Sequence, residues 1–188
     1  MTAMNRKGYF YVCHLESPMK SIISLLSVLA LAFAFLSPLP LAAKDKADPL
    51  AGDGLGKLME GTKAEEVVKL LGKPEKKGED LMMDATGLWE QEWKYPTQGL
   101  RLSMSSTKKG GAKTISTINA IDPCKLATAR GIKIGSTAAE VRKAYQGLED
   151  KDGPKSKETI VIGSVYGGII FSMKAGKVDS IFIGAAAE

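Results

Sequence analysis

Few side chains in this sequence are of the types that carry out catalysis. The one histidine is His14, and the two cysteines are Cys13 and Cys124. His14 and Cys13 both precede Ala43, after which we expect the chain to be cleaved. The mature chain then has one thiol and no imidazole, which excludes histidine triads, histidine general bases and histidine-ligated zinc.

The acidic and glycine-rich motifs fit structural roles better than catalytic ones. Residues 52–56, Gly-Asp-Gly-Leu-Gly, resemble a dinucleotide-binding loop, but no strand precedes them and the last glycine of that motif is missing. Four carboxylates fit a helix cap and solvent-facing positions: Glu65, Glu66, Glu90 and Glu92. The sequence therefore predicts a protein that is not an enzyme, with no catalytic residue, no cofactor and no metal ion.

An uncharged apolar segment predicts a secretory signal peptide over residues 19–43. It follows the basic residue Lys20, contains the helix breakers Pro38 and Pro40, and ends on small residues, as signal peptides do. It is also shorter than the roughly 20 apolar residues of a membrane span. We expect cleavage near Ala43, which makes the mature protein periplasmic or secreted, with no stable membrane span.

The segments on either side of the signal peptide carry two further expectations. Residues 1–18 mix aromatic and charged side chains, fit no signal design, and are expected to be a non-native or mis-started extension. Residues 44–54 are expected to form a linker. No cysteine follows the small residues at the end of the signal, so a lipid anchor is not expected.

The charge of the chain does not favour nucleic acid as a partner. The formal net charge is +5, but residues 1–43 hold Arg6, Lys7 and Lys20 against only Glu16, so processing lowers it to +3. Nucleic-acid-binding proteins gather Lys and Arg on one face, whereas the lysines here are separated by acids.

One basic turn stands out in the mature chain, running Lys108-Lys109-Gly-Gly-Ala-Lys113. A solvent-exposed hairpin turn accounts for it, and so does contact with an anionic envelope polymer or a small anionic molecule. The sequence leaves both interpretations open.

The chain contains an internal repeat. Residues 61–71, GTKAEEVVKLL, align with residues 135–145, GSTAAEVRKAY, and residues 99–104, GLRLSM, align with residues 168–173, GIIFSM. Segments that match in the same order along the chain are unexpected by chance and indicate a repeat. We therefore predict repeat unit one over residues 55–121 and repeat unit two over residues 122–188.

The residue pattern of each unit predicts a helix followed by strands. Thr62 and Ser136 are expected to cap the two helices, whose apolar residues recur at helical spacing. Alternating side chains predict strands at 88–95, 100–104, 114–121, 158–165, 169–173 and 178–183, while 73–80 is expected to be a charged loop. The fold class expected is α+β: two tandem units, each a short helix or helix pair on an antiparallel meander of three to four strands, with one continuous sheet as a variant.

The repeated pattern resembles that of the SmpA/OmlA-type outer-membrane assembly lipoproteins and of the tandem-repeat beta-lactamase inhibitory proteins. In unit one the resemblance rests on Gly61, Glu66, Val67, Leu71, Gly72, Pro74, Trp93 and Tyr95. In unit two it rests on Gly135, Glu140, Val141, Tyr145, Gly168, Phe171 and Val178. The resemblance implies a helix-plus-meander fold and a role in binding other proteins rather than in catalysis.

The large aromatic residues of the mature chain are the candidate partner-binding residues. Trp89, Trp93, Tyr95 and Tyr166 are of the types that dominate protein interfaces, although core positions beneath the helices explain the first two better. Tyr166 adjoins two glycines at a turn, which favours its exposure. A helix-backed antiparallel sheet also leaves its other face open for a partner.

The function expected is that of a secreted or periplasmic, non-catalytic protein-binding or scaffold module of the cell envelope. Its partner is expected to be another envelope or secreted protein and not nucleic acid. The alternative is a binder of an anionic polymer or small molecule through the turn of Lys108, Lys109 and Lys113. Cys124 is expected to be buried, and otherwise could join two copies through a disulfide.

Overall fold

The computed structural model describes residue 50, residues 52–151 and residues 156–186. The expected extension over residues 1–18 and the expected signal peptide over residues 19–43 lie outside these described residues. They remain predictions, as does cleavage near Ala43. Of the expected linker, only Leu50 and residues 52–54 are described.

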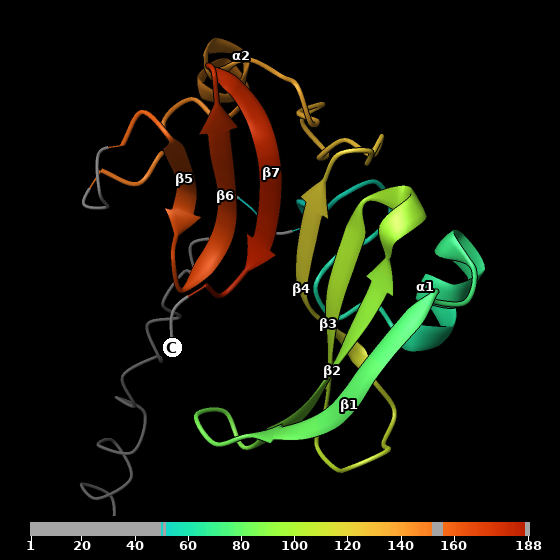
Figure 1. Ribbon diagram of the computed structural model, residues 1–188. Coiled ribbons are helices and arrows are strands. Elements are labelled where there is room, and N and C mark those ends of the chain that lie inside the picture. Colours follow the sequence, from blue (N-terminus) through green and yellow to red (C-terminus); the bar gives the residue numbers. More distant parts are fainter. Residues whose placement is uncertain (1–49, 51, 152–155, 187–188) are drawn as a thin grey trace, which may run out of the picture. The chain divides into compact units, whose positions relative to one another are not determined.

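A single antiparallel sheet dominates the described chain (Figure 1). Its strands are β1 (Lys76–Met83), β2 (Leu88–Tyr95), β3 (Leu100–Ser106), β4 (Thr114–Ile121), β5 (Thr159–Ser164), β6 (Gly167–Lys174) and β7 (Lys177–Gly184). They are arranged in the order β1-β2-β3-β4-β7-β6-β5. The pairing of β4 with β7, through Ile118 with Ile183 and Ala120 with Ile181, joins the two ends of the sheet.

The expected α+β fold of two tandem helix-on-meander units is wrong. The described chain is mostly β, with seven strands in one sheet and only two short α-helices, α1 (Ala64–Leu71) and α2 (Ala138–Ala144), besides the 3-10 turn η1 (Pro96–Gln98). The physical reason is the β4–β7 ladder, because it merges all the strands over one continuous hydrophobic core. No helix among the described residues is long and apolar enough to cross a membrane.

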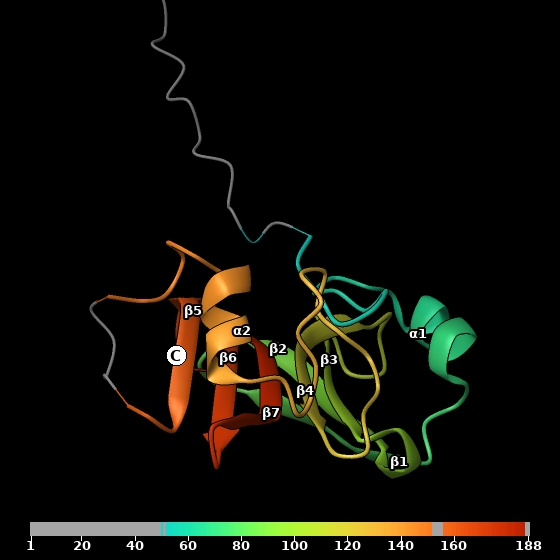
Figure 2. The same cartoon turned by 90° about the horizontal axis from the view of Figure 1, so that it is seen from above.

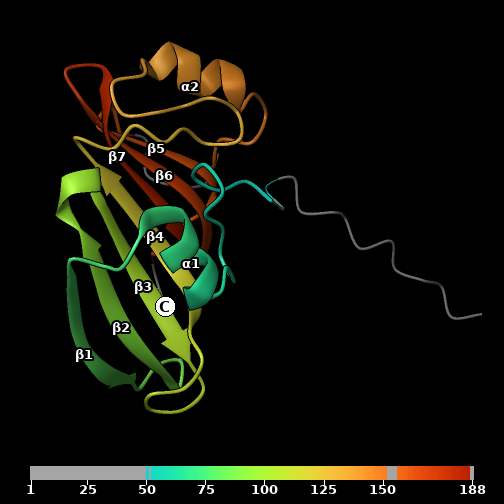
Figure 3. The same ribbon diagram turned by 90° about the vertical axis from the view of Figure 1, so that its right-hand side faces the viewer.

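One face of the sheet is covered. Buried side chains alternate along the strands and form two rows that cross the sheet, one through Leu102, Ile118 and Ile169 and one through Leu100, Ala120 and Phe171. Val67 of α1 and Val141 of α2 belong to the same core, so both helices cover this face (Figures 2 and 3). Helices of eight and seven residues are marginal alone and depend on this packing.

The two loops that lead into the helices make matching hydrogen bonds. Gly61 N–H donates to the Ile115 carbonyl before α1, and Gly135 N–H donates to the Val178 carbonyl before α2. In return, Ile115 N–H donates to the Thr62 carbonyl and Val178 N–H to that of Ser136. The segments that align in the sequence therefore anchor the helices to β4 and β7 in the same way.

The expected helix caps are one residue too early. Thr62 Oγ1 accepts a hydrogen bond from Met59 N–H at 3.0 Å, and Ser136 Oγ accepts one from Lys133 N–H at 3.2 Å, so both close the preceding turn. The first helical residue follows Lys63 in α1 and Thr137 in α2. Only Thr137 caps with its side chain, because its Oγ1 accepts from Glu140 N–H at 3.3 Å.

The two edges of the sheet are different. β1 replaces the charged loop expected at 73–80; it is an exposed edge strand with an irregularity between Lys77 and Asp80. At the other edge, β5 is partly covered by the chain that follows α2. Asp150 N–H donates to the Val161 carbonyl, and Gly163 N–H donates to the Leu148 carbonyl.

Candidate functional site

Two of the four aromatic residues expected to bind a partner lie in the core. Trp93 and Tyr95 are 4% and 1% exposed on the covered face of β2. Trp93 Nε1–H donates to Gln91 Oε1 at 2.9 Å, and Lys77 Nζ lies 4.1 Å from the centre of the Trp93 ring. Tyr95 O–H donates to the Gly72 carbonyl at 3.2 Å, and burial raises the pKa of Tyr95 to about 12. Tyr95 therefore ties the end of α1 to the sheet, and neither residue is accessible to a partner.

The other two aromatic residues are accessible to different degrees. Trp89 is half-buried near the start of β2, with Lys109 Nζ 5.3 Å from its ring centre. Tyr166 is 73% exposed at the turn between β5 and β6. Tyr166 is therefore the most exposed member of the expected set. It does not lie together with the tryptophans on β2.

The basic turn is partly engaged within the protein, through Lys113. Lys113 Nζ lies 2.6 Å from Asp80 Oδ1 and 3.2 Å from Ser106 Oγ, and its side chain is only 8% exposed. Gly110 N–H donates to Asp80 Oδ2 at 2.6 Å. These contacts lower the pKa of the Asp80 carboxyl, with the Lys113 hydrogen bond as the largest cause. Of the expected cationic set, Lys108 and Lys109 are exposed, and Lys109 lies near Trp89.

The opposite face of the sheet, here called the open face, carries side chains that alternate with the buried rows. Its middle row crosses all seven strands in register. The row consists of Lys76, Lys94, Arg101, Asn119, Phe182, Ile170 and Val161, and the last of these, on the edge strand β5, is buried. Its composition changes from cationic on β1 to β3, through an amide on β4, to apolar on β5 to β7.

Small polar residues flank this middle row. On one side, Ser103 pairs with Glu92 and Thr117; on the other, Ser172 pairs with Ser180. The flanking positions also include the longer side chains of Glu92 and Ile121, of which Ile121 is 51% exposed. Sequence reasoning did not identify the residues of the middle row, because each one occupies an ordinary alternate position of a strand.

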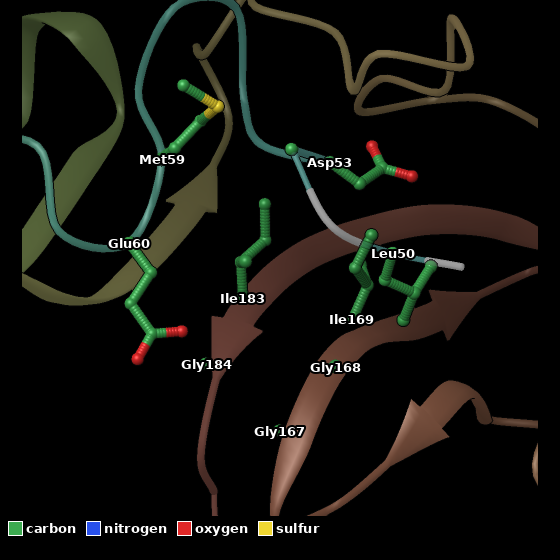
Figure 4. A pocket seen from close by; sticks show the side chains of 10 residues that line it. Leu50, Asp53, Met59, Glu60, Gly167, Gly168, Ile169, Ile183 and Gly184 are labelled. Carbon is green, nitrogen blue, oxygen red and sulfur yellow. The ribbon is translucent and has the colours of Figure 1, made fainter. Parts of the chain in front are cut away.

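A cavity of about 430 Å³ lies on the covered side, between the loop after Leu50 and the ends of β6 and β7 (Figure 4). Ile169 and Ile183 line it together with Leu50, while Asp53 and Glu60 supply carboxylates. Asp53 is engaged: its Oδ1 accepts from Ala129 N–H and its Oδ2 pairs with Arg130 Nε at 3.3 Å. Glu60 forms no ion pair with a described residue, so it is the unpaired carboxylate of this lining.

Behind this cavity, a polar link joins the loop at Asp53 to α2. The Arg130 guanidinium carbon lies 5.0 Å from the centre of the Tyr145 ring, and Arg130 Nη1 donates to the Ala144 carbonyl. Tyr145 is 1% exposed and packs against Phe171 with ring centres 5.6 Å apart. Burial raises the pKa of the Tyr145 hydroxyl well above its usual value. The cluster is a structural connection between elements of the fold.

Cys124 is not accessible as a nucleophile in the described part of the chain. The Cys124 thiol is free and 3% exposed, and burial raises its pKa, which disfavours the nucleophilic thiolate. An intermolecular disulfide through Cys124 would require the core to open. No group of three or more His, Cys, Asp or Glu side chains placed to hold a metal ion occurs among the described residues.

Compared with models of known protein families, with curated proteins and with solved structures, the chain matches none of them. The resemblance to the SmpA/OmlA-type lipoproteins and the beta-lactamase inhibitory proteins therefore stays a prediction from the repeated motif.

Proposed function

We propose that this chain is a non-catalytic protein-binding module of the cell envelope, periplasmic or secreted, and that it binds its partner on the open face of the sheet. The observation that carries the proposal is the middle row of that face. Phe182 and Ile170 are apolar and only half-buried, although the helices and the core lie on the opposite side. Apolar side chains at the centre of a polar surface are typical of protein interfaces.

The accessible aromatic residues support the same kind of partner. Tyr166 is exposed at the β5–β6 turn, adjacent in the chain to the start of the strand that carries Ile170. Tyrosine is enriched among the residues that dominate binding energy at interfaces. Tyr166 is thus a second contact candidate, separate from the row.

The alternative, an anionic polymer or small molecule on the turn of Lys108, Lys109 and Lys113, has less support. The Lys113 ammonium is paired with Asp80 and nearly buried. A polymer site would then depend on Lys108 and Lys109 alone, and its binding would weaken steeply with salt. Binding through the open face would change much less with salt, because part of it is apolar.

Affinity capture with matched variants tests the proposal. The full chain, tagged and produced in its own cells, is used to recover partners that mass spectrometry identifies. Phe182→Ser and Ile170→Thr alter the open face, while Leu70→Ser alters an exposed position on α1. We expect the first two variants to lose the partner and the third to retain it, with the fold checked by circular dichroism. Equal recovery by all three folded variants would show that the open face is not the binding surface.

A further inference from the structure

The cationic end of the middle row holds two cations on one carboxylate. Lys94 Nζ lies 2.7 Å from Glu92 Oε2, and Arg101 Nε lies 2.9 Å from Glu92 Oε1. Lys76, opposite Lys94 in the register, forms no ion pair with a described residue. Glu92 therefore pairs with two of the three cations in the row.

Arg101 is bound only through one side of its guanidinium group. Within the described residues, its Nε is paired with Glu92, whereas its two terminal nitrogen atoms have no hydrogen-bond partner. A guanidinium group has five N–H donors in a planar fork and can hold a second carboxylate through its remaining donors. The Arg101 side chain is 60% exposed, so a carboxylate from solvent or from a partner can reach these donors.

A cavity lies beside these cations on the open face. It measures about 280 Å³ and is lined by Lys94, Arg101, Asn119 and Ile121, together with Pro96, Gly99 and Leu100. Cavities that enclose drug-sized ligands are commonly about 300–1,000 Å³. This one is suited to a single side chain. Its polar lining of ammonium, guanidinium and amide groups fits a carboxylate.

The apolar part of the row lies at a fixed distance from this cavity. Asn119 is the register partner of both Arg101 on β3 and Phe182 on β7. Neighbouring strands are about 4.8 Å apart, so the backbone positions of Arg101 and Phe182 are separated by about 10 Å. Ile170 extends the apolar part by one more strand.

We propose that the middle row recognises an acidic, apolar segment of the partner protein. A carboxylate of that segment binds Arg101 and Lys94 at the cavity, and an apolar side chain about 10 Å away packs on Phe182 and Ile170. This inference rests on the proposed function, because it specifies the chemistry of a partner on the same face. A polyproline II segment fits the spacing: it rises about 3.1 Å per residue with three residues per turn, so side chains i and i+3 lie on one side about 9 Å apart.

A synthetic probe with this spacing tests the inference. The probe is acetyl-Pro-Glu-Pro-Pro-Leu-Pro-amide, and its control replaces Glu with Gln. Both are titrated into the ¹⁵N-labelled full chain while amide shifts are followed by NMR. We expect the Glu probe to shift amides of β3, β4 and β7 around Arg101, Asn119 and Phe182, and to bind about tenfold more tightly than the Gln probe.

Variants of the protein distinguish recognition of the probe's carboxylate from nonspecific binding. Arg101→Gln should weaken binding of the Glu probe about tenfold and leave the Gln probe unchanged. Glu92→Gln removes the competing carboxylate and should strengthen binding of the Glu probe several-fold, a gain that a damaged fold would not produce. Lys69→Gln, on the exposed side of α1, is the control and should change neither.

Equal binding of the two probes, or shifts confined to other parts of the protein, would overturn the inference. That outcome differs from failure of the proposed function. If Phe182→Ser still abolishes capture of the partner while the probes do not distinguish Glu from Gln, the open face binds its partner through other chemistry. If Phe182→Ser also leaves capture intact, both proposals are wrong.

Discussion

Lys113 Nζ lies 2.6 Å from Asp80 Oδ1 and joins β1 to the segment that precedes β4, two strands that are not neighbours in the sheet. The contact crosses the covered face near the start of β2 and the end of β3, where Ser106 Oγ also contacts the Lys113 ammonium. A basic residue that the sequence places in an exposed turn is therefore a connection across the sheet.

This ion pair predicts an acid-sensitive contribution to stability. The pKa of Asp80 is lowered, first by the Lys113 hydrogen bond and then by Gly110 N–H, whereas an unfolded aspartate has a pKa of about 3.9. A lowered folded-state pKa stabilises the native state above the unfolded value, and that stabilisation is lost as the pH falls through the folded value. We expect Asp80→Asn to melt at a lower temperature than the wild type at pH 7, with the difference closing below about pH 4.

Thermal melts between pH 7 and pH 2 measure this effect. Glu140 also has a lowered carboxyl pKa, caused by hydrogen bonds from the Thr137 backbone and hydroxyl, so Glu140→Gln provides a separate acid-dependent control. A constant difference between Asp80→Asn and the wild type over the whole pH range would argue against a role for the Asp80 charge.

The continuous core predicts that both ends of the sheet unfold together. Phe171 on β6 is 0% exposed, and Phe171→Ala should cost about 3–5 kcal/mol of the free energy of unfolding. The tryptophans, Trp89 and Trp93, are both on β2 at the other end of the sheet. Their fluorescence should nevertheless show the full loss of stability in urea, coincident with far-ultraviolet circular dichroism. A tryptophan transition that keeps the wild-type midpoint would mean that the two ends unfold independently.

Removing the side chain at the N-cap should affect stability differently in the two helices. Thr137 Oγ1 accepts from Glu140 N–H, so Thr137→Ala should cost about 0.5–2 kcal/mol of stability. Lys63 occupies the equivalent position of α1 and has no side-chain acceptor, so Lys63→Ala should be close to neutral. Urea unfolding of the two variants compares them, and equal losses would refute the assignment of Thr137 as the cap.

The backbone packed around Gly99 predicts that this position tolerates no side chain. It has φ 65°, and a Cβ there would collide with the backbone of Ile121, Pro123 and Cys124. Gly131 has φ 83° but open space around it. Gly131→Ala should cost about 1–2 kcal/mol for the left-handed conformation alone, and Gly99→Ala should cost clearly more. Equal free energies of unfolding for the two variants would contradict the packing described at Gly99.

Local patterns in the sequence identified most strands. Alternation placed β2 at 88–95 and β4 at 114–121, and the structure confirms both ranges. β1 was missed because an edge strand with Lys76, Lys77 and a glycine lacks the apolar alternation of a half-buried strand. The aromatic residues of β2 could be assigned to core or surface only with the fold in hand, since alternation shows which side chains share a face but not which face is covered.

The middle row of the open face could not be predicted from local sequence patterns, for a different reason. Its middle row depends on the register of β4 against β7, which pairs Asn119 with Phe182. That pairing joins residues about 60 positions apart, and no turn between them fixes it. Arg101 and Phe182 therefore lie on the same surface only because β4 pairs with both β3 and β7.

The unequal edges of the sheet limit how copies of this protein can associate through their backbones. Leu148 and Asp150 occupy hydrogen-bonding groups of β5 around Val161, whereas β1 is exposed along its length. Strand addition at β1 consumes the accessible edge of each copy. Such growth stops at a closed pair, because a fibre would need a second accessible edge on every molecule.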